Sequence, residues 1–501
     1  MTSKSNIVLS TREFKIVGKR PVRPDGTDKV TGRARYGADV MMGGMLHGKI
    51  LRSPHPHARI LSIDTSRAVA HPEVRAVAVS SDLAPAEDRI RADVDGIQSN
   101  FGYMSNNVLA GDKVLYVGHP VVGLAATSPH AAQEALSLID VEYEVLDAVM
   151  DIDAALAPGA PVLHERPVTP VERGGEFAGT NIVSHTHFAH GDIEVGFADA
   201  DVIIEREYRT QTVHQGYIEP QNVTAIWSED GHLTVWCSNQ GHFGLRHDVA
   251  ELTGLSVSEV TVIPMEIGGG FGGKIPAYLE PIAAVLSRKT DRPVKMTLDR
   301  AEVLEATGPT CGGIVRARVG ATRDGRITAG HVYLAFEAGA YPGSFVENAC
   351  NTVFASYDID NILIDGYDVV VNKPKTGAYR APGTPNAALA AETAIDDLAR
   401  ELGIDPVELR LLNAAREGSR RADGTVYPAI GMVEVAEAIM GHDHYRSPLP
   451  EPSSPGLKVG RGFAMGYSGN MSGEATVLAS LAADGTVKLV TGSVDIGGTR
   501  A

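Results

Sequence analysis

The first third of the chain alternates short β-type runs with helical stretches. Residues Ile139–Val145 alternate apolar and polar side chains, which is typical of a half-buried strand. Val74–Val79 and Pro120–Ala126 are predicted to be strands, and Pro129–Leu138 a helix, because proline is tolerated in the first helical turn. We therefore expect residues 26–147 to form a self-contained α/β unit after a polar N-terminal arm over residues 1–25.

Residues 181–445 are predicted to be strand-rich, with helices between the strands. Two pairs of β-type runs each flank an acidic residue followed by glycine and predict hairpins, at residues 224–237 and 315–334. Helical periodicity is found at Phe243–Leu252, Pro281–Arg288 and Ala387–Leu402, the last of which Gly403 is expected to end. This region is predicted to be a second, mixed domain.

Two further segments complete the predicted domain organisation. Residues 148–180 have little periodicity and many Ala, Pro and Gly residues, as expected of a linker. Residues 446–501 begin with a proline-rich stretch and contain two strand patterns, but they are too few to close a core of their own. We expect them to be the start of a further, incomplete domain, and the fold class to be α+β.

Composition and charge narrow the class of protein. Of the 501 residues, 43% are apolar and 21% charged, which is an ordinary globular profile and excludes a disordered, collagen-like or coiled-coil chain. The net charge of −17 disfavours nucleic acid and anionic membranes as partners. There is neither a signal-peptide core nor an apolar run of roughly 18 residues that could span a membrane, so a cytoplasmic location is expected. Three scattered cysteines cannot hold an iron–sulfur cluster.

The most informative motif is a glycine run that follows a β-branched strand. It consists of Gly268, Gly269, Gly270, Phe271, Gly272, Gly273 and Lys274. Such a loop exposes backbone N–H groups and lets an anionic ligand approach closely. Its spacing also matches nucleotide-binding loops, but Ile275 stands where a magnesium-binding Ser or Thr would be needed. Nucleotide binding and a merely close-packed turn remain as alternatives.

The run resembles the pterin-loop signature of the xanthine dehydrogenase/aldehyde oxidase family of molybdenum hydroxylases. Other segments resemble the same family in the same order, namely Leu51–Ala58, Tyr116–Pro120, Glu219–Pro220, Tyr379–Gly383 and Asp495–Gly498. The resemblance implies an α/β hammerhead-like domain followed by a strand-rich, mixed α+β domain that binds the molybdenum cofactor, molybdopterin.

The resemblance also implies roles for particular residues. Gln240 matches the glutamine whose amide lies near the molybdenum oxo group, Phe271 the phenylalanine beside the metal, and Arg380 the arginine of a second contact loop. The glycines of the first loop would seat the pterin, and Gly497 and Gly498 would make a further contact with it. The family's catalytic glutamate belongs to a C-terminal Gly-Glu motif that this chain does not reach.

The function implied by the resemblance is oxidation of an aldehyde or N-heteroaromatic carbon with water-derived oxygen. Electrons would pass to 2Fe-2S clusters and FAD on partner subunits, and a separate polypeptide could carry the C-terminal molybdenum-binding half. Ile275 replaces an acidic residue of the xanthine-oxidising members and disfavours a purine substrate, while Ala381 replaces the copper-binding cysteine of carbon monoxide dehydrogenases. The alternatives are a non-catalytic cofactor-binding or assembly module and a structural interaction protein.

Several histidines are candidates for separate sites. His185, His187 and His190 follow one strand and suggest zinc, but no acidic or cysteine ligand accompanies them at metal spacing, so zinc is not favoured. His214 and Glu219 could pair as base and acid, although a structural role for Glu219 is favoured. Cys237, within an apolar strand, is expected to be buried and inert.

Overall fold

The computed structural model describes residues 25–85, 90–92, 98–164, 177–469 and 477–491, together with positions 15, 19, 22 and 23. Most of the expected N-terminal arm, part of the expected linker, and Gly497 and Gly498 lie outside these residues. Among the residues described, no helix is long and apolar enough to cross a membrane. The cytoplasmic location stays a prediction.

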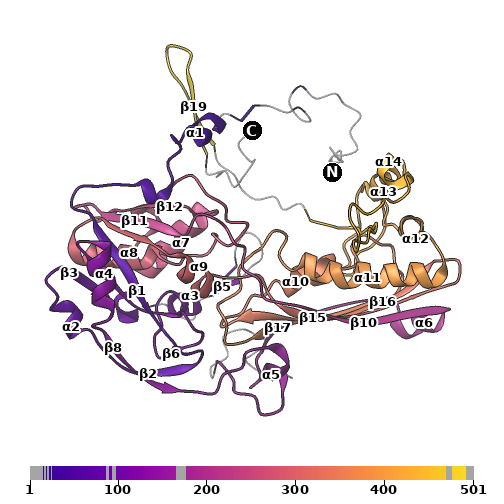
Figure 1. The fold of residues 1–501 in the computed structure, drawn as a ribbon, viewed down its shortest axis with the longest axis horizontal. Coiled ribbons are helices and arrows are strands. Elements are labelled where there is room, and N and C mark those ends of the chain that lie inside the picture. The colour runs from indigo at the N-terminus through magenta and orange to yellow at the C-terminus, as the bar shows by residue number, and fades with distance from the viewer. Residues whose placement is uncertain are drawn as a thin grey trace.

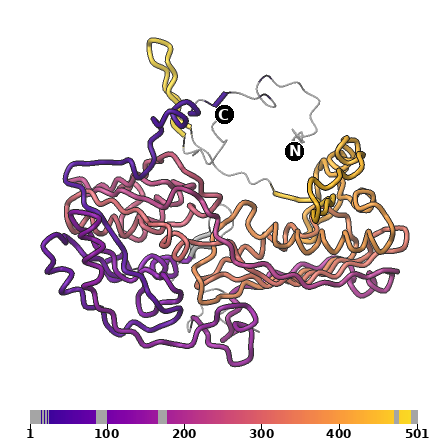
Figure 2. Tube along the Cα trace, viewed as in Figure 1, coloured from indigo at the N-terminus to yellow at the C-terminus, as the bar shows by residue number. Residues whose placement is uncertain are grey.

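A seven-stranded sheet joins the first two predicted units. Its order is β13 (Val260–Pro264), β12 (Leu233–Cys237), β11 (Asn222–Trp227), β14 (Val294–Thr297), β1 (Leu46–Arg52), β7 (Pro120–Ala126) and β3 (Val74–Ala78). Figures 1 and 2 show the indigo β1 in the same layer as the magenta strands of the later unit. Because β1 pairs in parallel with β14, the unit predicted over residues 26–147 shares a sheet with the later unit.

Helices cover both faces of this sheet. Strand β7 is buried along its whole length, as its uninterrupted apolar run requires. Its Ala125 belongs to the core with α7 (His242–Thr253) and α8 (Glu280–Thr290), whereas Leu124 packs with α4 (Pro129–Leu136) on the other face. A small sheet of β6 (Lys113–Val114), β2 (Ala58–Asp64) and β8 (Asp140–Val145) lies beside α4 and contributes to the same second core.

A second sheet, of five strands, also has helices on both faces. Its order is β10 (Val202–Thr210), β15 (Gly313–Ala321), β16 (Ile327–Gly339), β17 (Ile362–Val370) and β9 (Ile182–His190). Helices α10 (Val346–Thr352) and α11 (Thr384–Leu402) run along one face, with α5 (Ile152–Leu156) and α6 (Ile193–Ala198) on the opposite side (Figure 1). Alanines on the buried side of α11 let the helix pack closely on the strands.

The predicted hairpins and helices are confirmed in this region. Strands β11 and β12 pair antiparallel, as do β15 and β16. The helix α11 ends at Gly403, which adopts the left-handed conformation that glycine tolerates best. Within the predicted linker, α5 and Leu163 pack into a core with the five-stranded sheet, so this segment is anchored where it is described.

The remaining elements are short. They are α1 (Gly26–Val30), α2 (Ser66–Val69), α3 (Phe101–Val108), α9 (Arg300–Ala306), α12 (Pro406–Leu412), α13 (Met432–Met440), α14 (Asp443–Arg446), β4 (Ile90–Ala92), β5 (Gln98–Asn100), β18 (Val477–Leu481) and β19 (Val487–Thr491). The β18–β19 hairpin projects from the rest of the molecule, and all of its strand residues are exposed (Figure 1).

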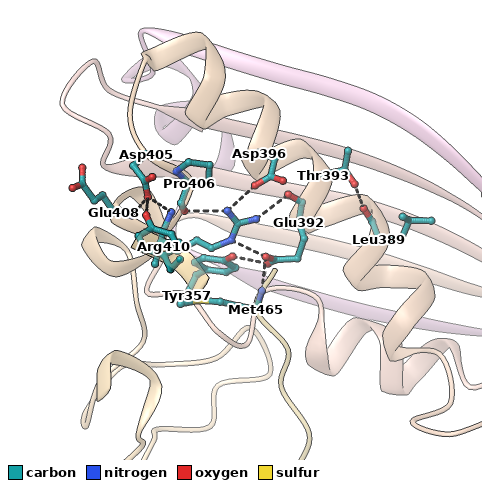
Figure 3. Close-up of polar contacts among 12 residues, drawn as sticks. Tyr357, Leu389, Glu392, Thr393, Asp396, Asp405, Pro406, Glu408, Arg410 and Met465 are labelled. Carbon is teal, nitrogen blue, oxygen red and sulfur yellow. Dashed lines mark hydrogen bonds and ion pairs between the residues drawn. The ribbon is translucent and has the colours of Figure 1, made fainter. Parts of the chain in front are cut away.

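A buried arginine fastens α12 to α11 (Figure 3). Arg410, with a fully buried side chain, donates from Nε to Glu392 Oε2 at 2.8 Å and from Nη1 to Asp396 Oδ1 at 2.7 Å. Glu392 also accepts from the Tyr357 hydroxyl at 2.5 Å and from the Met465 N–H at 2.8 Å. Burial opposes the charge of Arg410, but Tyr357, Glu392 and Asp396 raise its pKa above the ordinary value. The network therefore ties the chain near residue 465 to two helices.

Candidate functional site

The glycine loop lies where two parallel strands end. Strands β12 and β13 run in parallel, so their carboxyl ends meet at one edge of the sheet. Gln240 follows β12 and leads into α7, while the loop from Gly268 follows β13 and precedes α8. Crevices at the carboxyl ends of neighbouring strands are common ligand sites in α/β structures.

The Gln240 side chain is fastened to the glycine loop through its oxygen. Gln240 Oε1 accepts hydrogen bonds from the Gly272 N–H at 2.8 Å and the Lys274 N–H at 3.3 Å. Gly270 makes room for this contact, because a Cβ there would lie 2.4 Å from Gln240 Oε1. Since backbone N–H groups need an acceptor, the amide orientation is determined, and its NH₂ group is left as a donor.

The second loop contacts the first through the backbone. The Arg380 N–H donates to the Phe271 carbonyl at 3.0 Å. At Gly272 a Cβ would lie 2.4 Å from the Ala378 carbonyl oxygen, so only glycine permits this approach. The structure thus brings together Gln240, the glycine loop and the Arg380 loop, three segments that are far apart in the sequence.

Strained backbone is concentrated in these two loops. Among the described residues, five non-glycine residues have positive φ, and three of them are Phe271 (53°), Arg380 (33°) and Ala381 (67°). Such conformations cost about 1–3 kcal/mol each and persist where the surroundings impose them, often at functional sites. The sequence did not signal this strain.

The lysine of the glycine run points into the protein. Lys274, with 1% of its side chain exposed, donates from Nζ to Glu219 Oε2 at 2.6 Å, and lies 5.1 Å from the centre of the Tyr217 ring. Burial lowers the Lys274 pKa, and the negative charge of Glu219 opposes that shift. The same carboxylate oxygen accepts the Gly268 N–H at 2.7 Å. Lys274 is therefore unavailable to a nucleotide phosphate, which removes the support for the nucleotide-binding alternative.

Two other sequence candidates have structural roles. His214 Nε2 lies 2.8 Å from Thr307 Oγ1, and burial lowers the pKa of His214, so the histidine is not paired with Glu219 as a base. Cys237 is fully buried and burial raises the pKa of its thiol, as expected of an inert cysteine.

Gln215 is a residue that sequence reasoning missed. Its Nε2 donates to the carbonyls of Gly308 and Ala378, both at 2.9 Å, and so holds the second loop in place. No local motif marks Gln215, because its partners come from distant segments.

Several donors of the two loops remain unused by the protein. Within the described chain, the N–H groups of Gly269, Gly270 and Phe271 have no hydrogen-bond partner. The exposed Arg380 guanidinium likewise has no ion pair or hydrogen bond among the described residues. Together with the Gln240 NH₂, these groups form a donor set that suits an anionic ligand with oxo or phosphate groups.

Comparisons with known proteins identify two known domains in the chain. Residues 176–414 match the molybdopterin cofactor-binding domain, and residues 31–147 match the aldehyde oxidase and xanthine dehydrogenase a/b hammerhead domain. The expected order of a hammerhead-like domain followed by a molybdenum-cofactor-binding domain is therefore confirmed.

Individual relatives point the same way. The nicotinate dehydrogenase large molybdopterin subunit of Eubacterium barkeri is 31% identical over 448 residues, covering 87% of this chain and 100% of that protein. The nicotine 6-hydroxylase large subunit of Paenarthrobacter nicotinovorans is 31% identical over 476 residues, covering 92% of this chain and 56% of that protein. The aldehyde oxidoreductase structure from Desulfovibrio gigas is 27% identical with a TM-score of 0.82, covering 93% of this chain and 51% of that one. The chain thus spans about half the length of the latter two.

Proposed function

The chain belongs to the xanthine dehydrogenase/aldehyde oxidase family of molybdenum hydroxylases as a large molybdopterin-binding subunit, and from this we propose that its glycine loop, Gln240 and Arg380 seat the molybdenum cofactor in an assembled enzyme. The observation that carries the proposal is the unused donor set of the two touching loops. The cofactor brings its own sulfur ligands to the metal, which agrees with the burial of all three cysteines of the chain.

Each part of the site has a physical task in this proposal. When bound, the cofactor supplies the two-electron oxidation of a carbon centre with oxygen derived from water. The free NH₂ of Gln240 would donate to an oxo group of the cofactor, and the N–H groups of Gly269, Gly270 and Phe271 would donate to pterin oxygens. Arg380 provides positive charge for the anionic group. Because the Lys274–Glu219 pair and Gln215 hold the loops in advance, few groups need to be ordered on binding.

The side chains beside the loop support a proposal for the substrate class. Phe271 and Ile275 expose 46% and 47% of their surfaces, so apolar groups border the glycine loop. With Ile275 in place of an acidic side chain, the site offers no carboxylate at that position to a purine. We propose an aldehyde or an N-heteroaromatic compound as the substrate, in keeping with the names of the nicotinate and aldehyde enzymes among the relatives.

Partner polypeptides complete the proposal. Electrons would leave to 2Fe-2S clusters and FAD on partner subunits. Both strands of the β18–β19 hairpin carry apolar side chains with more than half of their surface exposed, including Leu478, Leu481 and Leu489. A lone two-stranded hairpin is marginal in water. We propose that it packs against a further molybdenum-binding part of the enzyme, which a separate polypeptide could carry.

The test is Gln240→Ala in the purified complex, with substrate turnover and molybdenum and pterin contents measured together. Loss of one hydrogen bond to a charged centre is expected to lower turnover about 10- to 100-fold while the fold is kept. The matched control is Gln133→Ala, since Gln133 is exposed on α4 far from the site in the sequence.

The outcomes distinguish a subunit of an active molybdenum hydroxylase from a non-catalytic cofactor-binding or assembly module. Unchanged turnover in Gln240→Ala would contradict the role of Gln240. If the wild-type complex binds cofactor but oxidises neither aldehydes nor N-heteroaromatics, the chain is a cofactor-binding or assembly module. If it oxidises xanthine faster than both, the substrate proposal is wrong.

A further inference from the structure

A compact group of metal-ligating side chains lies on the five-stranded sheet, on the face opposite α10 and α11. Strands β9 and β17 pair antiparallel, with Asp365 directly opposite His187 and Tyr367 opposite His185. Neighbouring even-numbered residues of β17, such as Ile364, are buried in the core under α11, so Asp365 points to the other face. Directly opposed side chains in a sheet are close enough to share a ligand.

The three side chains already converge on one point. His185 Nε2 lies 3.0 Å and His187 Nδ1 2.8 Å from the same oxygen, Asp365 Oδ1. An ionised carboxylate only accepts, so both imidazoles donate to it. Although burial opposes ionisation of Asp365, the hydrogen bonds from His187 and His185 hold its pKa below the ordinary value. All three potential ligand atoms lie within 4.8 Å of one another.

Aromatic neighbours hold the inner histidine in place. The His185 ring stacks on Tyr367 with centroids 4.5 Å apart and an interplanar angle of 6°, and Phe177 meets it edge-on at 5.6 Å. The side chains of His185 and Asp365 are 26% and 20% exposed, whereas that of His187 is 53% exposed. The cluster is thus rigid on its inner side and open to solvent on its outer side.

The composition of this cluster differs from the sequence expectation. His190 pairs with Ile362, a core residue, so it lies on the opposite face of β9 from His185 and His187. The acidic ligand that the sequence lacked near these histidines is Asp365, which strand pairing supplies from 178 residues away. From the sequence zinc is not favoured, because no acidic partner stands near these histidines. In the structure only His185 and His187 share a face, and Asp365 joins them there.

We propose that His185, His187 and Asp365 bind a divalent first-row transition-metal ion of the zinc class. Two imidazole nitrogens and one carboxylate oxygen suit such ions better than Mg²⁺ or Ca²⁺, which prefer all-oxygen ligands. Each neutral imidazole places its proton on the other ring nitrogen, so that a lone pair faces the ion and no net proton is lost. Water fills the remaining position of a tetrahedral site on the exposed side.

The site would link the edge strand β9 to the inner strand β17. Because the ion binds the folded sheet and not the separated strands, it would raise the thermal stability of the protein. The cluster uses none of the residues of the two cofactor loops, so it can be tested without a loaded molybdenum site.

The experiment is a titration of the full chain, purified in its complex without a histidine tag, with Co²⁺ and then Zn²⁺. We expect visible absorption bands of Co²⁺ bound to nitrogen and oxygen ligands, their loss when Zn²⁺ displaces Co²⁺, and a higher melting temperature with Zn²⁺. Asp365→Asn and His187→Ala should each weaken Co²⁺ affinity by more than about 10-fold. Loss of a residue that only hydrogen-bonds to a metal ligand already weakens metal binding by about 10-fold or more, and these variants change a ligand itself.

The matched control is His190→Ala, which removes a histidine from the same strand but from the other face. This variant should bind Co²⁺ like the wild type. Circular dichroism shows whether each variant keeps its fold, and the exposure of His187 favours that outcome for His187→Ala. If the wild type binds Co²⁺ no more tightly than Asp365→Asn, or if His190→Ala weakens binding as much as His187→Ala, the proposal is overturned.

Discussion

Two buried ion pairs in this protein use similar chemistry for different ends. At the glycine loop, Lys274 is paired with Glu219, with side chains 1% and 11% exposed. Between α11 and α12, Arg410 is paired with Glu392, with side chains 0% and 8% exposed. Burial and pairing alone therefore do not tell a functional region from a structural one.

The difference lies in what surrounds each pair. Arg410 donates hydrogen bonds to Glu392, Asp396 and the Pro406 carbonyl, and Glu392 is itself shared with Tyr357 and Met465. Beside Lys274, the loop N–H groups of Gly269, Gly270 and Phe271 and the exposed Arg380 guanidinium have no partner among the described residues. Unused donors on a fixed loop are what the proposed cofactor site requires, whereas the hydrogen bonds of the Arg410 network are all made within the protein and join two helices.

The largest expected effect is on the closed network. Arg410→Ala leaves the buried Glu392 carboxylate without its counter-charge, which should lower the free energy of unfolding by about 3–5 kcal/mol. Urea denaturation followed by circular dichroism measures the change. Arg400→Ala is the control, since the Arg400 side chain is 76% exposed and Asp397 keeps a second partner in Arg206. An ion pair with so exposed a partner contributes at most about 1 kcal/mol. Equal losses in the two variants would contradict the structural role of Arg410.

A smaller effect is expected at the glycine loop. Glu219→Gln keeps an acceptor for Gly268 and Lys274 but removes the charge, so we expect a loss of about 1–3 kcal/mol and a lower molybdenum content. The control is Glu144→Gln, which breaks an exposed pair with Arg59.

The Glu219→Gln deficit should also depend on pH. Glu219 raises the Lys274 pKa against burial, so without it that pKa falls further below the ordinary lysine value. The unfolded chain then holds the lysine proton more tightly than the folded one, and stability rises with pH. The deficit relative to wild type should therefore shrink as the pH approaches the ordinary lysine pKa. A deficit independent of pH would mean that the charge of Lys274 does not need Glu219.

The smallest effect on stability should come from Gly270→Ala. The new Cβ would meet the movable end of Gln240 at 2.4 Å, so the amide shifts and the Gly272 N–H loses its acceptor, at a cost of about 1 kcal/mol. Gly244→Ala on α7 is the control, because a Cβ there meets nothing within 4 Å. It should be neutral or stabilising by about 0.5–1 kcal/mol. If Gly270→Ala matched this control in urea denaturation and molybdenum content, the close contact with Gln240 would be unimportant.

The amino-acid sequence by itself determined the local elements and the identity of the loops. Periodicity and turn residues act over a few neighbours, so the hairpins β11–β12 and β15–β16 and the helix α11 could be predicted from them. The glycine run, Gln240 and Arg380 could be singled out by their resemblance to a family. Their contact with one another could not be derived from spacing, since 32 residues separate Gln240 from Gly272 and more than a hundred separate Gly272 from Arg380.

Only the tertiary structure decided the partners that strand pairing and loop packing bring in from a distance. In the structure, Lys274 pairs with Glu219 and is not free to bind a phosphate, and β1 lies in the sheet of the later unit. His190 lies on the opposite face of β9 from His187, and Asp365 lies beside His187. The physical reason is that a side chain's charge state and free donors depend on whatever surrounds it in space, and a linear pattern carries information only about its own neighbours along the chain.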